Sequence, residues 1–214
     1  MLSGGTIEKD GNCPTILKFV EEFDISRYKG KWYTQYRTAN KPILNCAQMD
    51  VIKTSKGYYI RNLSEHPKKN TPIINRFKIV GLNDTGVFNV SAIVLSESNT
   101  RELQTWIVDT DYKNYALQFS CAHLLKQKSL HDGLIVTRQR HPPEDLLARI
   151  TLTVNEVGLD LADFQRVNQA GCIHKRHAPL TAPLKDNLGR MKNEDIITTE
   201  KISRRPTRKL AVGK

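Results

Sequence analysis

Short runs of alternating apolar and polar residues fill the chain between about residues 30 and 140. Each run is rich in Val, Ile, Thr, Tyr and Phe, and turn residues such as those at 55–57 and 83–86 separate one run from the next. The eight runs cover residues 30–37, 47–54, 57–64, 74–81, 86–95, 102–109, 114–125 and 133–140. Because no helical periodicity separates them, they predict consecutive antiparallel strands rather than a parallel sheet with crossover helices.

The periodicity changes after residue 140, where apolar residues recur at helical spacing. Pro142 and Pro143 are suited to open a helix, and Gly158 is placed to end it. Glu144 and Asp145 favour the positive N-terminal end. The apolar stripe consists of Leu146, Leu147, Ile150, Val154 and Val157. The chain is therefore expected to be all-β, an eight-stranded antiparallel up-and-down barrel with one C-terminal α-helix packed outside, since closure removes exposed sheet edges.

Positive charge is concentrated at the end of the chain. The 214 residues carry a net charge of +11, and residues 173–214 contribute 11 Lys plus Arg against 4 Asp plus Glu, without an aromatic residue. Such a segment buries too little apolar surface to stay ordered. We therefore predict a basic, disordered tail over 173–214, a folded domain over 13–172 and a flexible N-terminal segment over 1–12. The tail is expected to touch anionic surfaces only weakly, and specific nucleic-acid binding is not expected.

The cysteines and the glycosylation sequons bear on the cellular compartment. The four cysteines fit no paired zinc motif and allow three disulfide connectivities. Three N-x-[ST] sequons, at Asn62, Asn83 and Asn89, are candidate glycosylation sites. The opening residues lack the apolar core of a signal peptide, which leaves two alternatives, a leader already removed or a cytosolic protein. An even cysteine count and the sequons together favour a secreted, extracellular glycoprotein.

Two short motifs and one arginine fall at the same end of the predicted barrel. They are Gly30-Lys31-Trp32, Thr110-Asp111-Tyr112 and Arg138. Trp32 is expected to plug this end, with the Arg138 guanidinium over its indole and Gly30 leaving room for the backbone. Asp111 is expected to bond local backbone amides rather than to act as a catalytic acid. The motifs are therefore expected to form the floor of the barrel rather than to contact a ligand.

The order and spacing of these motifs over residues 13–172 resemble the lipocalin family. The flanking stretches NCPTILKFVEEFDISRYKGKWY and TDYKNYALQFSC resemble its apolipoprotein D branch, which includes insect bilin-binding and Lazarillo-like proteins. The resemblance implies disulfides Cys13–Cys121 and Cys46–Cys172. It also implies a barrel that holds one small ligand. It implies nothing about the tail.

Strand alternation predicts which side chains line the interior once one residue of a strand is oriented. A glycan must face outward, so Asn62 and Asn89 orient their strands, whereas Trp32 and Arg138 orient the first and last strands from the inside. On the seventh strand we favour the apolar set. The expected ligand-binding residues are Tyr36, Tyr59, Arg61, Leu63, Phe88, Val90, Ala92, Leu117, Phe119, Leu134 and Val136, with Tyr36 included only if no bulge intervenes. Arg61 or a tyrosine is expected to orient the polar end of the ligand.

The sequence favours binding over catalysis. It contains no G-x-S-x-G, no H-E-x-x-H and no phosphate-cradling glycine loop, so no catalytic residue, metal or cofactor is expected. We expect a secreted carrier of a small lipophilic ligand, which could be a fatty acid, sterol, retinoid, carotenoid or bilin. One alternative is an interaction module that acts through its rim, glycans or basic tail, its interior filled by its own side chains. A calyx enzyme is less favoured, because all four cysteines are expected in disulfides.

Overall fold

The computed structural model describes residues 6–39, 44–68, 71–82, 84–92 and 102–172. By internal contacts the chain divides into Met1–Cys172 and Ile173–Lys214, and the described fold belongs to the first unit. The predictions for the tail and for Asn83 lie outside the described residues. Among the helices that are described, none combines the length and the apolar content needed to cross a membrane.

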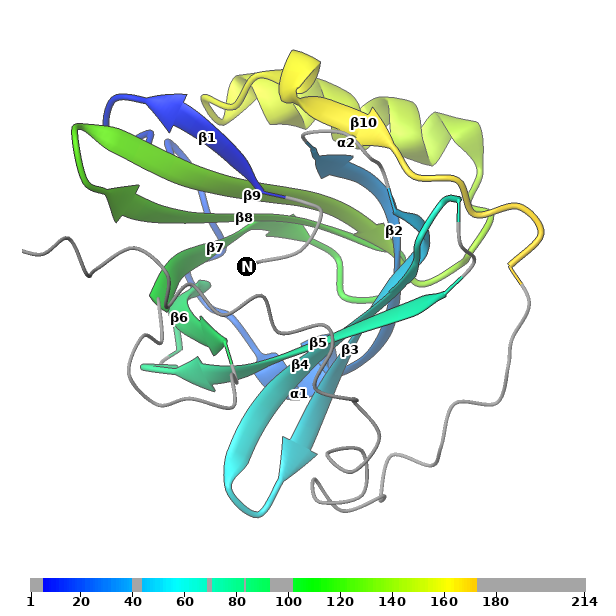
Figure 1. Ribbon diagram of the computed structural model, residues 1–214. Coiled ribbons are helices and arrows are strands. Elements are labelled where there is room, and N and C mark those ends of the chain that lie inside the picture. The colour runs from blue at the N-terminus through cyan, green and yellow to red at the C-terminus, as the bar shows by residue number, and fades with distance from the viewer. Residues whose placement is uncertain (1–5, 40–43, 69–70, 83, 93–101, 173–214) are drawn as a thin grey trace, which may run out of the picture. The chain divides into compact units, whose positions relative to one another are not determined.

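Eight antiparallel strands form a closed barrel, as the sequence predicts. They are β2 (Gly30–Thr38), β3 (Asn45–Thr54), β4 (Gly57–Glu65), β5 (Pro72–Val80), β6 (Val87–Ala92), β7 (Glu102–Thr110), β8 (Tyr115–Leu124) and β9 (Lys128–Thr137). Each strand pairs with its neighbour in sequence, and pairing of β9 with β2 closes the ring. Figure 1 shows these strands curling around a common interior.

Two further short strands extend the sheet, and neither is predicted from the sequence. β1 (Ile7–Asp10) pairs antiparallel with the start of β9, and β10 (Phe164–Arg166) pairs antiparallel with the end of β2. The expectation of a flexible segment over residues 1–12 is therefore wrong for Ile7–Asp10. Pattern reading misses β1 because Ile7 is the only apolar residue in it.

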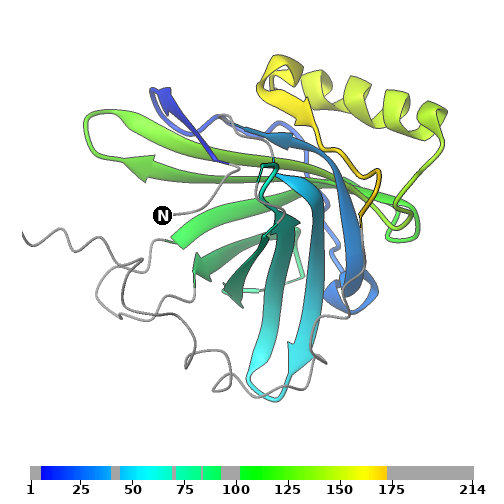
Figure 2. The same ribbon diagram turned by 45° about the vertical axis from the view of Figure 1, so that its right-hand side comes forward.

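The predicted helix is α2 (Glu144–Glu156), and Figure 2 shows it outside the barrel. Pro143 is its N-cap, and Gly158 follows its end with a φ of +84°, a left-handed conformation that glycine adopts readily. Its buried face, which includes Ile150 and Val154, packs against residues of β8 and β9. Two short helical turns, α1 (Ile25–Tyr28) and η2 (Leu161–Asp163), begin at aspartates that accept backbone N–H groups.

The sheet separates an inner apolar cluster from an outer one that lies beneath α2. The inner cluster includes Phe23, Tyr28, Trp32, Met49, Val51, Ile60, Ile79, Phe88, Val90, Leu103, Ile107, Leu134 and Val136. The outer cluster includes Val108, Leu117, Phe119, Ile135, Ile150, Val154 and Phe164. Gly133 of β9 marks the division, because a Cβ on it would meet Phe164 of the outer cluster. Its neighbours Asp132 and Leu134 therefore point inward.

Both disulfides implied by the resemblance are present, Cys13–Cys121 and Cys46–Cys172, with sequence separations of 108 and 126 residues. The first ties the segment before α1 to β8. The second ties β3 to the segment after β10. Together they link the segments that precede and follow the barrel strands to the barrel itself.

Candidate functional site

The closed end of the barrel is built around Trp32 of β2. This side chain is fully buried, and its Nε1 donates to the Tyr28 carbonyl oxygen at 2.8 Å. The guanidinium carbon of Arg138 lies 3.6 Å from the centre of the indole ring. The predicted cation–π pair is thus present, and such a pair contributes about 1–2 kcal/mol when desolvated.

Arg138 also satisfies the backbone around this end. Its guanidinium donates to five carbonyl oxygens at 2.9–3.3 Å, those of Arg27, Tyr28, Lys29, Lys31 and Tyr112. Gly30 lies beside it with a φ of +101°, and a Cβ there would lie 3.3 Å from Arg138 Nη1. Glycine therefore allows both the left-handed backbone and the close approach of the guanidinium.

The turn at Thr110–Tyr112 closes over the same end. Asp111 Oδ1 accepts the backbone amides of residues 113–115 at 2.7–3.1 Å. Burial raises the pKa of the Asp111 carboxyl, but these hydrogen bonds stabilise the carboxylate and the net shift is downward. The Tyr112 hydroxyl accepts the Asp24 amide at 3.1 Å and so links the turn to α1. Asp111 therefore bonds local amides as predicted, and the turn completes a structural floor.

The wall of the interior beyond this floor is mainly apolar. Phe88 and Val90 of β6, and Leu134 and Val136 of β9, belong to the inner cluster, as the sequence predicts. Asn89 lies on the opposite face of β6, where its Nδ2 is 3.4 Å from an exposed glutamate oxygen. The expected orientation of both strands is confirmed at these positions. The side chain of Ala92 lies outside the described part of the chain.

Three residues expected inside lie on the outer face beneath α2. Tyr36, Leu117 and Phe119 pack with the outer cluster. A bulge between Thr34 and Tyr36 shifts the register of β2 against β9 and turns Tyr36 outward. Leu117 and Phe119 point outward because α2 covers that face of β8. The apolar set of this strand is consequently the outer set.

The expected orientation of β4 is also wrong. Ile60 belongs to the inner cluster, so Tyr59, Arg61 and Leu63 point outward. Arg61 lies opposite Asp50 of β3 and donates to its Oδ2 from Nε at 3.2 Å and from Nη2 at 2.7 Å. Arg61 is therefore paired on the outer face and cannot orient a ligand inside the barrel.

Asn62 is the source of this error, because its sequon implies an outward side chain. Asn62 instead shares the inward face with Met49, its cross-strand partner in the inner cluster. Its Oδ1 is buried without a hydrogen-bond partner among the described residues. A glycan on Asn62 is incompatible with this orientation, whereas Asn89 faces outward and stays a predicted site.

A charged pair inside the barrel is absent from the predicted set. Arg37 of β2 donates to Asp132 of β9, from Nε to Oδ1 at 3.2 Å and from Nη2 to Oδ2 at 3.1 Å. Burial raises the pKa of the Asp132 carboxyl, and Arg37 opposes that shift by stabilising the carboxylate. The two residues lie 95 positions apart, and Asp132 precedes the run that predicts β9, so no sequence signal joins them.

Other polar side chains continue from this pair across the inner face. Ser120 of β8 lies opposite Asp132, and its hydroxyl is 2.8 Å from that of Thr105 on β7. We refer to Arg37, Asp132, Ser120 and Thr105 as the inner polar stripe. The interior thus combines apolar walls with one polar stripe across four strands. Within the described ranges, no three His, Cys, Asp or Glu side chains are grouped closely enough to hold a metal ion.

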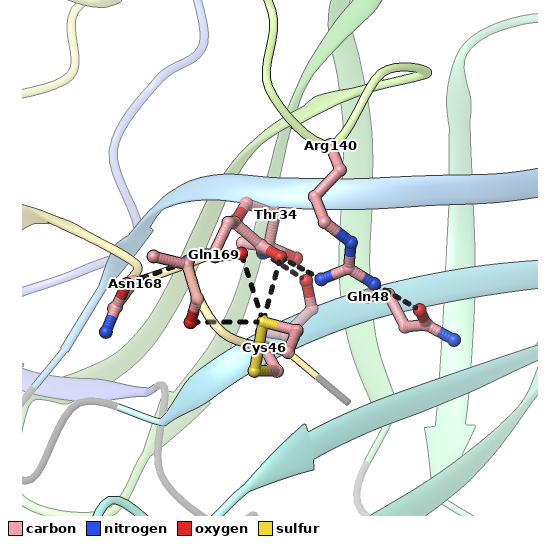
Figure 3. The surroundings of a disulfide bond; sticks show 9 residues. Thr34, Cys46, Gln48, Arg140, Asn168 and Gln169 are labelled. Atoms are coloured by element: carbon pink, nitrogen blue, oxygen red, sulfur yellow. Dashed lines mark hydrogen bonds between the residues drawn. A yellow bond between two sulfur atoms is a disulfide. The ribbon is translucent and has the colours of Figure 1, made fainter. Parts of the chain in front are cut away.

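A concave region lies outside the barrel, near the Cys46–Cys172 disulfide. Gln169 is one of its lining residues, and Figure 3 shows it beside the disulfide, where Nε2 donates to the Thr34 carbonyl at 2.8 Å and Oε1 accepts Arg140 Nη1 at 2.6 Å. The cleft has a volume of about 410 Å³, and its walls come from β2, residues 140–144 at the start of α2, and residues 166–170 at and after the end of β10. These contacts fasten the end of the domain to β2.

Known proteins share this sequence pattern and architecture. A family model described as Triabin matches residues 8–144. Apolipoprotein D from Mus musculus is 26% identical to the chain over 167 residues, which cover 76% of this chain and 85% of the relative. The similarity therefore spans most of both proteins.

Solved structures share the fold at lower sequence identity. Insecticyanin from the tobacco hornworm Manduca sexta aligns with a TM-score of 0.62 and 18% identity, covering 77% of this chain and 89% of that chain. The tryptamine complex of the amine binding protein of Rhodnius prolixus aligns with a TM-score of 0.58 and 20% identity, covering 73% and 86% respectively. At these identities the similarity concerns the fold alone.

Proposed function

We propose that this chain, which belongs to the lipocalin-like Triabin family, is a carrier that binds a small hydrophobic molecule inside its barrel. The observation that carries the proposal is the sealed end. Trp32 and Arg138 close the barrel there, and the apolar inner cluster forms the wall beyond them. A protein of the same fold in complex with tryptamine supports a small-molecule ligand for this architecture.

Burial of apolar surface provides the binding energy in this proposal. Each Å² of apolar ligand surface removed from water contributes about 25 cal/mol. Ordering of a flexible ligand offsets part of this gain. The candidate ligands are a fatty acid, sterol, retinoid, carotenoid or bilin, because each has a large apolar body and few polar groups.

The proposed carrier is secreted and does not catalyse a reaction. Two disulfides occupy all four cysteines of the sequence, and disulfides persist in oxidising compartments. No cysteine thiol is therefore left to act as a nucleophile. The outward side chain of Asn89 is the proposed glycosylation site, and the basic tail is proposed to add only weak contact with anionic surfaces.

Binding of diphenylhexatriene, a fluorescent hydrocarbon without hydrogen-bonding groups, tests the carrier proposal. Ala122 of β8 belongs to the inner cluster, so the indole of Ala122→Trp is expected to occupy space that the fluorophore needs and to weaken binding at least about tenfold, or about 1.4 kcal/mol. Ala148→Trp, on the exposed side of α2, is the matched control and should leave binding unchanged. Circular dichroism checks that both variants fold. A folded wild type that does not bind the fluorophore contradicts the proposal, as does equal binding by the two variants.

Mass spectrometry of material extracted from the native protein identifies the ligand class. Organic solvent should release a lipophilic molecule in an amount comparable with that of the protein. Repeated native preparations that release no such molecule, together with absent fluorophore binding, would favour the interaction module over the carrier.

A further inference from the structure

We propose that the barrel selects a lipophile whose polar end is uncharged and both donates and accepts hydrogen bonds, such as a hydroxyl or a primary amide. The geometry points to the Arg37–Asp132 pair as the group that makes this selection. The inference rests on the proposed carrier function and narrows its ligand class, because it favours alcohols over fatty acids and amines.

Both members of the pair point into the barrel. Arg37 lies opposite Leu134, a residue of the inner cluster, because the preceding bulge reverses the alternation of β2. Asp132 precedes Gly133, whose missing Cβ faces the outer cluster, and it lies opposite Ser120 on the inner face of β8. The pair is therefore part of the interior wall that a ligand would meet.

The pair retains hydrogen-bonding capacity for a ligand. Each Asp132 oxygen accepts one N–H from Arg37, and a carboxylate offers about four acceptor positions. The contacts of Arg37 use Nε and Nη2, which leaves Nη1 without a partner among the described residues. The side chains are 14% and 17% exposed, so part of each side chain remains accessible. A ligand can thus bond to both residues without breaking the pair.

Charge decides which polar group suits this position. The carboxylate and the guanidinium neutralise each other, so an added carboxylate or ammonium would leave one net charge in an apolar interior. An uncompensated buried charge is far more costly than a neutral polar group with partners. A hydroxyl can donate to Asp132 and accept from Arg37 Nη1, and it adds no charge.

The position of the pair along the barrel determines where the apolar body of a bound ligand would lie. Arg37 lies five residues beyond Trp32 on β2, and Asp132 of β9 lies six residues before Arg138, which follows the end of that strand. At about 3.3 Å per residue these separations correspond to about 16 and about 20 Å along the strands. Inner-cluster residues Leu134 and Val136 occupy the wall between. The apolar body of the ligand is therefore placed toward Trp32 and its hydroxyl toward the pair.

The barrel carries a matched control pair on its outer face. Arg61 and Asp50 form the same kind of ion pair, with side-chain exposures of 19% and 8%. Their strands alternate so that neither residue points inward. Substitutions there test the loss of an arginine–aspartate pair without changing the interior.

Displacement of diphenylhexatriene by decanol, decanoic acid and decylamine at neutral pH tests the inference. In the wild type, decanol should displace the fluorophore at a concentration at least about tenfold lower than either charged ligand, because each of these adds an unpaired charge. Asp132→Asn leaves Arg37 unpaired and should shift the preference to decanoate. Arg37→Gln leaves Asp132 unpaired and should shift it to decylammonium. Arg61→Gln and Asp50→Asn should keep the wild-type order.

The double variant Arg37→Met/Asp132→Leu covers the case in which a single substitution does not fold. It should bind the fluorophore like the wild type but require about tenfold more decanol for displacement, because the hydroxyl loses both of its hydrogen-bonding partners. Displacement by decanol at the same concentration in the wild type and the double variant would overturn the selection by the pair while leaving the carrier function standing. Failure of every folded form to bind the fluorophore would instead overturn the carrier function.

Discussion

The closed end of the barrel and the inner polar stripe use arginine in opposite ways. Arg138 gives its hydrogen bonds to five backbone carbonyls and stacks on a buried indole, so little of its capacity remains. Arg37 is held by one carboxylate and keeps Nη1 for another partner. The same side chain therefore fixes the backbone at one level of the barrel and offers a polar contact at another. The stability of the fold is therefore expected to depend on Arg138, and the selectivity for the ligand on Arg37.

Trp32→Ala should produce the largest loss of stability. The indole is fully buried among aromatic neighbours such as Tyr28, with ring centres 5.0 Å apart, so its removal leaves a large cavity. Truncation of a buried aromatic residue costs about 3–5 kcal/mol. Urea unfolding followed by circular dichroism measures the difference. Trp106→Ala removes an equal volume from a partly buried site in the outer cluster and should cost less. Equal losses of unfolding free energy in the two variants would show that the closed end contributes no more to stability than the outer cluster.

Arg138→Lys should cost about 1.5–3 kcal/mol, because hydrogen bonds from charged groups contribute on this scale and a lysine ammonium cannot span carbonyls that a planar fork reaches. The charge is retained, so the loss reports geometry. Arg149→Lys is the control, since Arg149 is exposed on α2 with its guanidinium carbon 5.8 Å from the Tyr115 ring. That variant should stay within about 0.5 kcal/mol of the wild type. Similar free energies of unfolding for both variants would contradict the assigned role of Arg138.

The double variant Arg37→Met/Asp132→Leu should change the free energy of unfolding by less than about 1 kcal/mol. Replacing both members of a largely buried ion pair by apolar residues is often neutral, and the partial exposure of this pair weakens its attraction further. Urea unfolding again gives the measurement. A loss as large as that of Trp32→Ala would remove the contrast between the two arginines, because the stripe would then also be a structural requirement.

The sequence predicts the closed end better than the interior wall. Asp111 bonds to amides close to it in sequence, and Arg138 stacks on Trp32 because the ends of β2 and β9 meet there. Residue type and strand order are therefore enough to predict these contacts. The outward orientation of Asn89 also predicts correctly that Phe88 and Val90 of β6 face the interior. Strand alternation predicts orientation correctly where the chemistry of one side chain fixes whether it points inward or outward.

Strand alternation alone does not predict which residues line the interior wall. Tyr36 turns outward because of a bulge that no composition signal marks, and Leu117 turns outward because a helix distant in sequence covers its strand. Asn62 misleads because a sequon does not require an outward side chain. Arg37 and Asp132 meet only after barrel closure, so their pairing could not be predicted from the sequence.

His131 lies on the outer face of β9, next to Asp132 in sequence. Its titration is expected to change the free energy of unfolding least. Its ring is buried edge-on against Phe119, with ring centres 5.3 Å apart. Burial lowers the pKa of His131, Lys9 lowers it further and Asp163 opposes the shift. In the unfolded chain the pKa of histidine is about 6.5. The unfolded state therefore takes up a proton first, and stability falls as the pH drops below that value.

Urea unfolding between about pH 7.5 and pH 5 measures this loss, a range above the titration of ordinary carboxylates. His131→Gln should flatten the dependence, because the variant has no buried imidazole to protonate. His123→Gln, an exposed position on β8, is the control for removal of a histidine and should retain the wild-type slope. An unchanged slope in His131→Gln would show that burial against Phe119 does not disfavour the imidazolium. The outer face of β9 would then tolerate a charge, and the contrast with the paired carboxylate on its inner face would disappear.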